Sequence, residues 1–499
     1  MDSARQSPND WLLDIQRKLY QWSVEHPTEG YRDLWNWVAD SRNLELAYQR
    51  VKANTGRNTP GIDGMTIVKI EKGIGRETFL STLRERLIRR DYTPKPVRRK
   101  WIPKPGKPDQ LRGLGIPAID DRVIQSAIKQ IIEPIFEARF LHVSNGFRPG
   151  RAVRDAIELT RLMMRGNKRV LVRKKPPYEY VIEGDIQSCF DQIDHHALMS
   201  RVRKGISDRR VTRLITSFLK AGVMEEPIFF QTTRGTPQGG ILSPLLANIA
   251  LSVIEERYQR WVHVGHAAFP RQQAAKNRTR DLAQSRPIFF PIRYADDFIL
   301  LAAGTKEQIE AEKRELGNFL STTLGLVLSP EKTKTTSFTE GFKFLGHQIR
   351  LKSHLRFGWM LRITIPNEAK LRFRNKIKAL TRNGSTRQPL NRLLKQINPI
   401  ILGWGNFYRY TSWAWKPFNT HDRFVFQRIE GWLRKKYRKA NFQEIYRRHY
   451  ARGGSGNQLR WVDKGIACNW LREIKRPGWW NPRNRRLPQY MFAVGKPGA

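Results

Sequence analysis

Hydrophobic and polar positions recur along the chain with two different periods. Apolar residues recur at helical spacing over residues 11–52, 77–90, 119–139 and 208–220, and again in the stretch PLLANIALSVIEERY. One face of a helix is covered by residues about 3.6 positions apart, so these stretches are predicted to be amphipathic helices.

Short apolar runs indicate strands elsewhere. They occur at 180–186 and 342–349, and residues 292–302 read as an apolar strand, an acidic turn and a second apolar strand. The Pro-Gly-Lys-Pro centre of residues 92–117 predicts a loop between the two short strands of a hairpin. From about residue 364 the pattern becomes helical, basic and rich in tryptophan.

The charge of the chain indicates its partners. Among 499 residues, 91 are lysine or arginine and 45 are aspartate or glutamate, which gives a net charge of +46. Such a field attracts polyanions, so DNA or RNA is the expected partner and binding should weaken with salt. An anionic membrane surface or a ribosomal role are the alternatives, and 15 tryptophans are unusual for a ribosomal protein. We expect no secretory signal and no transmembrane helix, because no apolar run is long enough.

Candidate chemistry begins with two adjacent carboxylates, Asp296 and Asp297, between apolar strands. Adjacent carboxylates repel each other and are costly to bury, so folding alone gives no reason for them. Asp185 ends another apolar strand, and a third carboxylate would allow two cations about 3.5–4 Å apart to share the site, as in phosphoryl transfer. Magnesium suits such a site. The alternative is an ordinary Asp-Asp turn, with Asp191 and Asp194 as helix caps.

A glycine-rich segment, RGTPQGGILSPLLANI (234–249), is the third candidate. Its glycines would let the backbone approach a base pair or a phosphate closely, and Pro244 lies where a helix tolerates proline in its first turn. Gln238 could contact an incoming nucleotide. A strand-to-helix turn without a ligand is the alternative.

These three segments, in this order, resemble the palm motifs of group II intron-encoded reverse transcriptases. The likeness extends to GIDGMT (61–66), to 101–125 and to 325–349, and it covers about residues 30–440. The resemblance implies an α+β fold, a right-hand polymerase with fingers and palm followed by an all-α thumb or maturase domain. The implied domains are an N-terminal helical extension (1–66), fingers and palm (67–363), a thumb or maturase domain (364–440) and a basic, DNA-binding-like tail (441–499).

The resemblance also implies roles for matching residues. Two Mg²⁺ ions would be held by Asp185, Asp296 and Asp297, with help from the Ile186 carbonyl. Phe190 would be a steric gate that favours dNTPs over rNTPs. The other implied nucleotide contacts are Lys104, Arg112, Gln238 and Lys332, the last as a proton donor to pyrophosphate for which Lys334 competes.

The basic region 386–440 would bind nucleic acid. Most of its aromatic residues are expected to form a core, with basic side chains beside them following a nucleic acid backbone. The expected nucleic-acid contacts are Arg234, Arg409, Arg434, Lys435 and Lys436. Cys468 is the only cysteine after the maturase-like segment, and with Cys189 it makes the chain's two. We therefore expect the zinc-supported HNH nuclease of many relatives to be absent.

The segment 257–293 looks longer than in relatives. It carries eight lysines and arginines and a single acid, Asp281. We expect a flexible surface loop and a candidate RNA contact.

The function implied is an RNA-directed DNA polymerase. It would copy an RNA template from a DNA or RNA primer with dNTPs, bind target DNA, and bind its group II intron RNA to assist splicing and mobility, without a membrane and in the bacterial cytoplasm. Two alternatives stay open: a domesticated reverse transcriptase in defence or DNA repair, and an RNA-folding splicing cofactor without polymerase activity.

Overall fold

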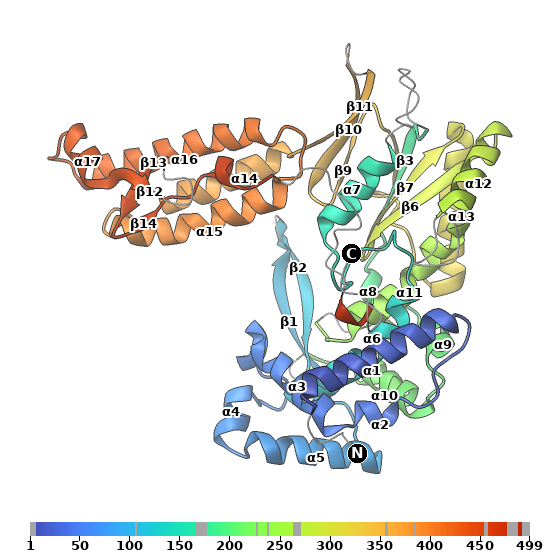
Figure 1. Ribbon diagram of the computed structural model, residues 1–499. Helices are drawn as coiled ribbons and strands as arrows, with labels where there is room; N and C mark the ends of the chain where they lie inside the picture. The colour runs from blue at the N-terminus through green and yellow to red at the C-terminus, as the bar shows by residue number, and fades with distance from the viewer. Residues whose placement is uncertain are drawn as a thin grey trace. The chain divides into compact units, whose positions relative to one another are not determined.

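The structure is a computed structural model that describes residues 6–104, 107–164, 177–225, 228–236, 239–262, 271–354, 358–382, 385–453, 458–476 and 488–491 (Figure 1). The chain divides into two compact units. The first contains Met1–Thr160, Tyr178–Thr335 and Arg485–Ala499, and the second contains Arg161–Pro177 and Thr336–Asn484. The predicted boundary at residue 363 therefore lies inside the second unit.

The first unit begins with helices that enclose one long buried helix, α6 (Ile119–Glu137). Helices α1 (Pro8–Glu25) and α3 (Ser41–Ala53) pack on α6, and the side chains of Ser7 and Asp40 cap their N-termini. The predicted helices over 11–52, 77–90 and 119–139 are confirmed. The remaining elements here are α2 (Trp35–Val38), η1 (Thr55–Asn58), α4 (Ile67–Lys72) and α5 (Arg76–Arg89).

A long hairpin follows. Strands β1 (Val97–Lys104) and β2 (Lys107–Ile116) pair antiparallel, as the sequence predicts. They form a sheet of order β2-β1-β4-β5 with β4 (Val223–Glu225) and β5 (Ile228–Phe230). Between β2 and β4 the chain also forms, after α6, the helices α7 (Val153–Met163), α8 (Cys189–Gln192), α9 (His195–Gly205) and α10 (Arg209–Lys220).

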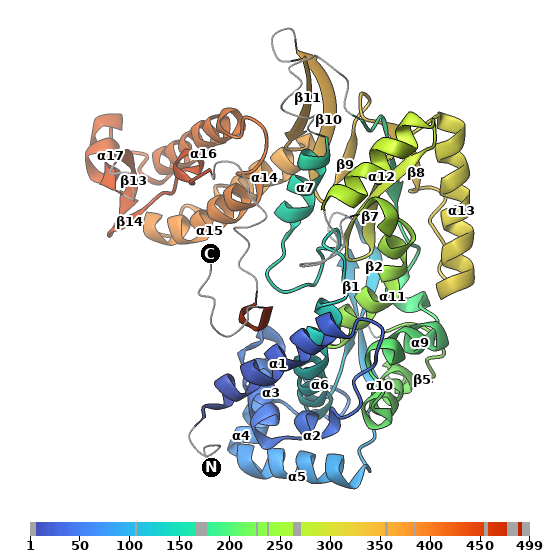
Figure 2. The same cartoon turned by 45° about the vertical axis from the view of Figure 1, so that its right-hand side comes forward.

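The second sheet of the first unit is buried and has the order β6-β7-β3-β8. Strands β6 (Ile288–Tyr294) and β7 (Asp297–Ala303) form the predicted hairpin, and β3 (Tyr180–Gly184) pairs antiparallel with β7. Strand β8 (Lys334–Ser337) lies where the chain passes into the second unit. Helix α11 (Ser243–Arg257) packs against β6, and α13 (Lys306–Leu324) follows β7 (Figure 2).

The prediction of a flexible loop over 257–293 is wrong. The segment contains η2 (Gln259–Trp261) and helix α12 (Arg271–Ala283), which packs on η2 and β6. Its only acid is buried: Asp281 accepts hydrogen bonds from Arg260 (2.7 Å), Trp261 (2.9 Å) and Arg286. A single carboxylate therefore gathers several of the basic side chains that a charge count assigns to a surface loop.

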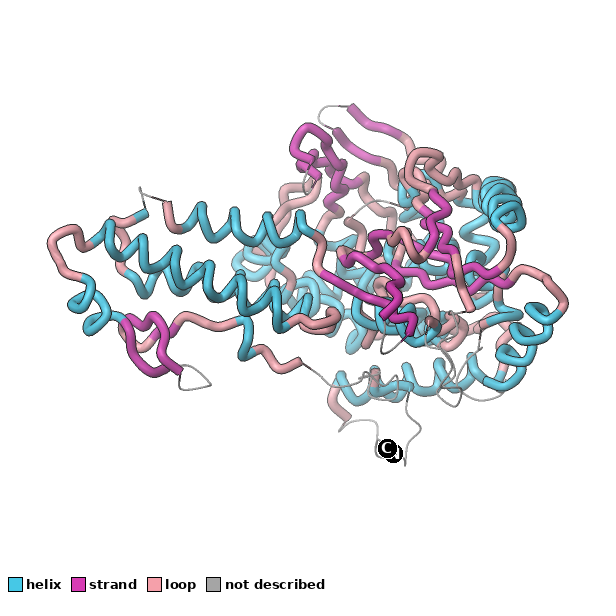
Figure 3. The backbone as a smooth tube through the Cα atoms, turned by 90° about the horizontal axis from the view of Figure 1, so that it is seen from above, coloured by secondary structure: helices cyan, strands magenta, loops and turns pink. Residues whose placement is uncertain are grey.

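The second unit joins a small sheet to a helical bundle. Strands β9 (Phe342–Phe344), β10 (His347–His354) and β11 (Gly358–Thr364) form the sheet. Helix α14 (Asn367–Leu380) packs on both α15 (Leu390–Tyr408) and α16 (Trp415–Lys436), and the three run side by side in Figure 3. Among the described residues no helix is both long and apolar enough to cross a membrane.

Much of the predicted tail belongs to the core of this bundle. Ile445, Trp461, Cys468, Leu471 and Ile474 are buried in one hydrophobic cluster with residues of α14, α15 and α16. Ile445 belongs to α17 (Phe442–His449) and Trp461 to β13 (Gln458–Asp463), Cys468 follows β14 (Ile466–Ala467), and Leu471 and Ile474 lie at the two ends of η4 (Leu471–Glu473). Strand β12 (Tyr450–Gly453) completes a sheet of order β12-β13-β14. The region after residue 364 is therefore not all-α, and its helical core does not end at residue 440. Near the C-terminus, η6 (Gln489–Met491) packs on α1 in the first unit.

Candidate active site

Three carboxylates converge at one end of the buried sheet. The register pairs Gly184 with Phe298 and Tyr294 with Asp297. One step beyond the pair Gly184–Phe298, Asp185 comes opposite Asp297 on the neighbouring strand, and adjacent strands lie about 4.8 Å apart. Gly184 is required at this pair because a Cβ atom there would stand 2.1 Å from the Phe298 ring. The local pairing therefore brings together the three aspartates that the sequence singles out.

The carboxylates perturb one another. Burial raises the pKa of Asp297 to about 6, with further contributions from Asp296 and Asp185. Burial also raises the pKa of Asp296, and the charge of Asp185 adds to the shift, while Arg112 and Arg293 oppose it. Mutual repulsion of this kind is relieved when a cation binds.

The donor set fits a hard divalent cation. Carboxylate oxygens and a backbone carbonyl are the ligands that magnesium prefers. In the β-bridge between Ile186 and Leu328, the Gln187 N–H donates to the Val327 carbonyl and the Asp185 carbonyl accepts from the Ser329 N–H. The Ile186 carbonyl takes no part in these two hydrogen bonds. In the described part of the chain, no three His, Cys, Asp or Glu side chains are grouped as a ready-made metal cage. Asp185 is held instead by Lys332, whose Nζ lies 2.9 Å from Oδ2.

The glycine-rich segment is joined to the residues that follow Asp185. Gly235 N–H donates to the Ile193 carbonyl (2.8 Å) and Thr236 N–H donates to the Phe190 carbonyl (2.6 Å). A Cβ at Gly235, whose φ is +84°, would stand 2.7 Å from the Phe190 carbonyl oxygen. Arg234 is exposed and bridges to Asp194 through the backbone. Gln238 lies outside the described residues.

Phe190 is partly buried in α8, five residues after Asp185 in the sequence. Its ring meets the exposed ring of Phe147 edge-on, with centroids 6.2 Å apart. Phe147, which has φ +55°, is not among the residues that the sequence motifs single out. Asp194 does cap α9, accepting from the Ala197 N–H at 2.8 Å, as the alternative reading of that residue predicts.

The hairpin β1–β2 supplies one of its two candidate cations to the site. Arg112 is exposed and lies opposite Ile102, and its charge lowers the pKa of Asp296. It is therefore within electrostatic reach of the carboxylates. Lys104 is the last residue of β1, and its side chain lies outside the described part of the structure.

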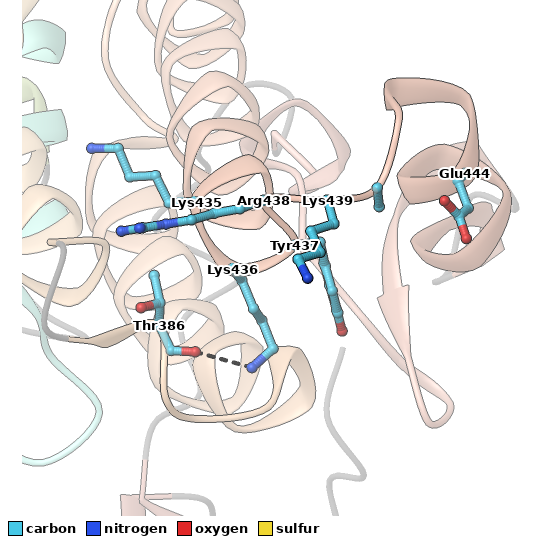
Figure 4. A pocket seen from close by; sticks show the side chains of 8 residues that line it. Thr386, Lys435, Lys436, Tyr437, Arg438, Lys439 and Glu444 are labelled. Atoms are coloured by element: carbon cyan, nitrogen blue, oxygen red, sulfur yellow. Dashed lines mark hydrogen bonds between the residues drawn. The ribbon is translucent and has the colours of Figure 1, made fainter.

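The candidate contacts of the second unit divide into two kinds. Lys435 is exposed at the end of α16, where it lines a hollow of about 640 Å³ in which four of the eight lining residues are basic. In Figure 4, Lys435 and Arg438 extend to the same side of α16, whereas Lys436 turns away. Lys436 donates to the carbonyls of Thr386 and Gln388, both at 3.0 Å. Its ammonium is therefore engaged in joining α16 to the loop that precedes α15.

The other two candidates also have partners within the protein. Arg434 pairs with Glu430 at 2.8 Å and stacks on Phe442. Arg409 donates to the Tyr410 hydroxyl at 2.8 Å and to the Lys475 carbonyl. Each guanidinium therefore makes contacts within the second unit that help to hold its fold.

Two segments of the chain match known protein families. Residues 102–349 match the family described as reverse transcriptase (RNA-dependent DNA polymerase), and residues 370–450 match the maturase-specific domain of group II introns. The chain belongs to the group II intron reverse transcriptases and maturases. The predicted recognition and the RNA-directed DNA polymerase class are confirmed. The family implies a right-hand polymerase, with which the mixed helix and sheet architecture agrees, and a requirement for divalent metal.

Individual relatives extend this group II intron reverse transcriptase match. Protein YkfC of Escherichia coli (strain K12) is 36% identical over 377 residues, which cover 74% of this chain and 96% of YkfC. The group II intron-encoded protein LtrA of Lactococcus lactis is 31% identical over 382 residues, 68% of this chain but 60% of LtrA. A COX1/OXI3 intron 1 protein of Saccharomyces cerevisiae is 28% identical over 62% of this chain and 38% of its own length.

Proposed function

We propose that this chain extends a DNA or RNA primer along an RNA template with dNTPs, at the site formed by Asp185, Asp296 and Asp297. The convergence of these three carboxylates at one sheet end, with raised pKa values at Asp296 and Asp297, is the observation that carries the proposal. We propose two Mg²⁺ ions there, held by the aspartates and the Ile186 carbonyl. When bound, such ions activate the primer hydroxyl and neutralise the leaving pyrophosphate.

The remaining roles follow from position. Arg112 would neutralise the triphosphate, for which a guanidinium is apt because it contacts phosphate with two donors. Phe190 would exclude a 2′-hydroxyl, since it follows Asp185 by five positions and its partly buried ring is supported by Phe147. The Lys332 ammonium forms an ion pair with Asp185. Cation binding at Asp185 would release this ammonium, which would then face the triphosphate.

The second unit supports a maturase role for the same chain. Its match to the maturase-specific domain covers α14 to α17, and basic side chains line the hollow at the end of α16. We propose that this surface binds structured intron RNA through its phosphates, which would assist splicing and mobility, and that the chain also contacts target DNA. The bacterial cytoplasm is the location we propose with it.

The test is dNTP incorporation on a poly(rA)/oligo(dT) template–primer with Mg²⁺. We expect synthesis by the wild type and a loss of roughly 10³-fold or more in the Asp296→Ala, Asp297→Ala double variant, because groups that act as a unit fail together. Asp191→Ala is the matched control, since Asp191 is an exposed carboxylate of α8 near the site. Template–primer binding should survive in both variants.

Either of two results would redirect the proposal. A folded wild type that binds RNA but makes no DNA would leave an RNA-folding cofactor as the function. Synthesis without any dependence of splicing on the protein would favour a domesticated polymerase in defence or repair.

A further inference from the structure

The arginine that precedes the catalytic turn is completely buried. Arg293 has no exposed surface and forms an ion pair with Glu255 of α11, which is equally buried. A buried pair of this kind is costly to desolvate and adds little to stability compared with apolar packing. Its presence one residue before the turn that carries Asp296 and Asp297 therefore calls for an explanation other than stability.

Arg293 uses its whole guanidinium to organise that turn. Its Nε and Nη2 donate to the two carboxylate oxygens of Glu255 at 2.8 and 2.6 Å, and Nη2 also donates to the Ser144 hydroxyl at 2.9 Å. Its Nη1 donates to Asn248 Oδ1 at 3.0 Å and to the Ala295 carbonyl at 2.9 Å. The last bond fixes the peptide between Ala295 and Asp296.

The turn needs this support because its backbone is strained. Ala295 has φ +59°, a left-handed conformation that residues with a Cβ adopt at a cost. On its other side the turn abuts Gly146, where a Cβ would stand 2.1 Å from the Ala295 nitrogen. The Gly146 carbonyl in turn accepts from Asn248 Nδ2 at 2.8 Å. Asn248 thus contacts both the arginine and the segment against the turn.

The same network connects two motifs. Asn248 and Glu255 both lie on α11, the helix that begins at Ser243 within the glycine-rich segment. A rigid helix held to the catalytic turn through one guanidinium relates the nucleotide side of the site to the carboxylates. We propose that Arg293 is a positioning residue, which sets the orientation of Asp296 and Asp297 toward their cations by holding the Ala295 carbonyl. The inference deepens the proposed polymerase function and rests on it.

The primary test replaces Arg293 by lysine, which keeps the charge but cannot reach all these acceptors. Mn²⁺ binding to the nucleotide-free protein, followed by electron paramagnetic resonance, should weaken at least about tenfold. At saturating Mg²⁺, kcat for dNTP incorporation should fall about 100-fold, the effect of a displacement of about 1 Å at the reacting centre. The KM for template–primer should stay within about threefold.

A matched control separates positioning from loss of a buried arginine. Arg460 of the second unit is also fully buried and bonds to Glu473 and the Cys468 carbonyl. Arg460→Lys should lower the melting temperature as Arg293→Lys does, but leave Mn²⁺ affinity unchanged. Asn248→Ala keeps the Arg293–Glu255 pair, so it should weaken Mn²⁺ binding less than Arg293→Lys does. If the Arg293→Lys protein does not fold, Asn248→Ala takes its place as the test variant.

The outcomes distinguish this proposal from the proposed function. Folded Arg293→Lys or Asn248→Ala proteins with wild-type Mn²⁺ affinity and kcat would overturn the positioning role. If the wild type binds Mn²⁺ in a manner that depends on Asp296, Asp297 and Arg293 but makes no DNA, the positioning role stands and the polymerase proposal fails.

Discussion

Lys332 donates a hydrogen bond to Asp185, with 2.9 Å between Nζ and Oδ2. The lysine side chain is 62% exposed and the carboxylate 31%, so water competes for both partners. An ion pair of this exposure contributes at most about 1 kcal/mol to stability. The pair is therefore one that a divalent cation can replace at small cost.

We expect Lys332→Met to separate stability from chemistry. The free energy of unfolding should change by less than about 1 kcal/mol, measured by urea denaturation in EDTA. If the released ammonium assists the departure of pyrophosphate, the rate of incorporation should fall about 100-fold. Lys334→Met, on the exposed first residue of β8, is the control and should retain the wild-type rate. An unchanged rate in Lys332→Met would remove the proton-donor role.

The raised pKa of Asp297 predicts a pH dependence in the absence of divalent cations. Its pKa in the folded protein is about 6, whereas an unfolded aspartate has a pKa of about 4. Between these values the folded state binds more protons, so stability falls as pH rises through this window. Comparing urea midpoints at about pH 5 and about pH 7.5 in EDTA, we expect a smaller fall in Asp297→Asn. The same slope in both proteins would contradict the prediction.

Burial alone would raise the pKa of Asp281, but hydrogen bonds from Arg286, Trp261 and Arg260 outweigh it and lower the pKa to about 2. A depressed pKa contributes stability above about pH 4 that is lost as pH falls toward about 2. Asp281→Asn should therefore destabilise the protein at neutral pH, by about 1.5 kcal/mol, because the arginines that lose a charged partner are half-exposed and can be solvated. Hydrogen exchange in α12 would locate the effect; protection equal to that of the wild type would argue against it.

The sequence predicts local features well where a strong pattern is confined to neighbouring residues. The hairpin around Asp296 and Asp297, the hairpin β1–β2 and the buried helix α6 all form as predicted. Pairing of β3 with β7, which brings Asp185 to the turn, required the resemblance to a known family, because it joins segments more than a hundred residues apart.

Tertiary context decided what the pattern could not. Helix α12 has almost no apolar stripe and is held through buried Asp281, so the pattern of apolar residues does not predict a helix there. Arg293 counted as one of eight basic residues in a loop, although a charge inside an apolar strand was the available signal of a buried partner. Trp461 lies in the segment predicted to be a DNA-binding-like tail, but its complete burial against Phe426 makes it a core residue.

Substitutions of two adjacent lysines at the end of α16 should have different effects on stability and on RNA binding. Lys436 joins the carbonyls of Thr386 and Gln388, so Lys436→Met should lower the free energy of unfolding by about 1.5–3 kcal/mol, the range for hydrogen bonds to a charged group. Lys435 is exposed where it lines the hollow, so water screens its interactions and Lys435→Met should change the free energy of unfolding by less than about 1 kcal/mol. If Lys435 contacts an RNA phosphate, its loss should reduce the slope of log affinity against log salt by about 0.7–0.9, measured by fluorescence anisotropy with a labelled RNA. The reverse pattern, in which only Lys436→Met changes the salt slope and leaves unfolding unaltered, would show that the contact through Thr386 and Gln388 opens when RNA binds.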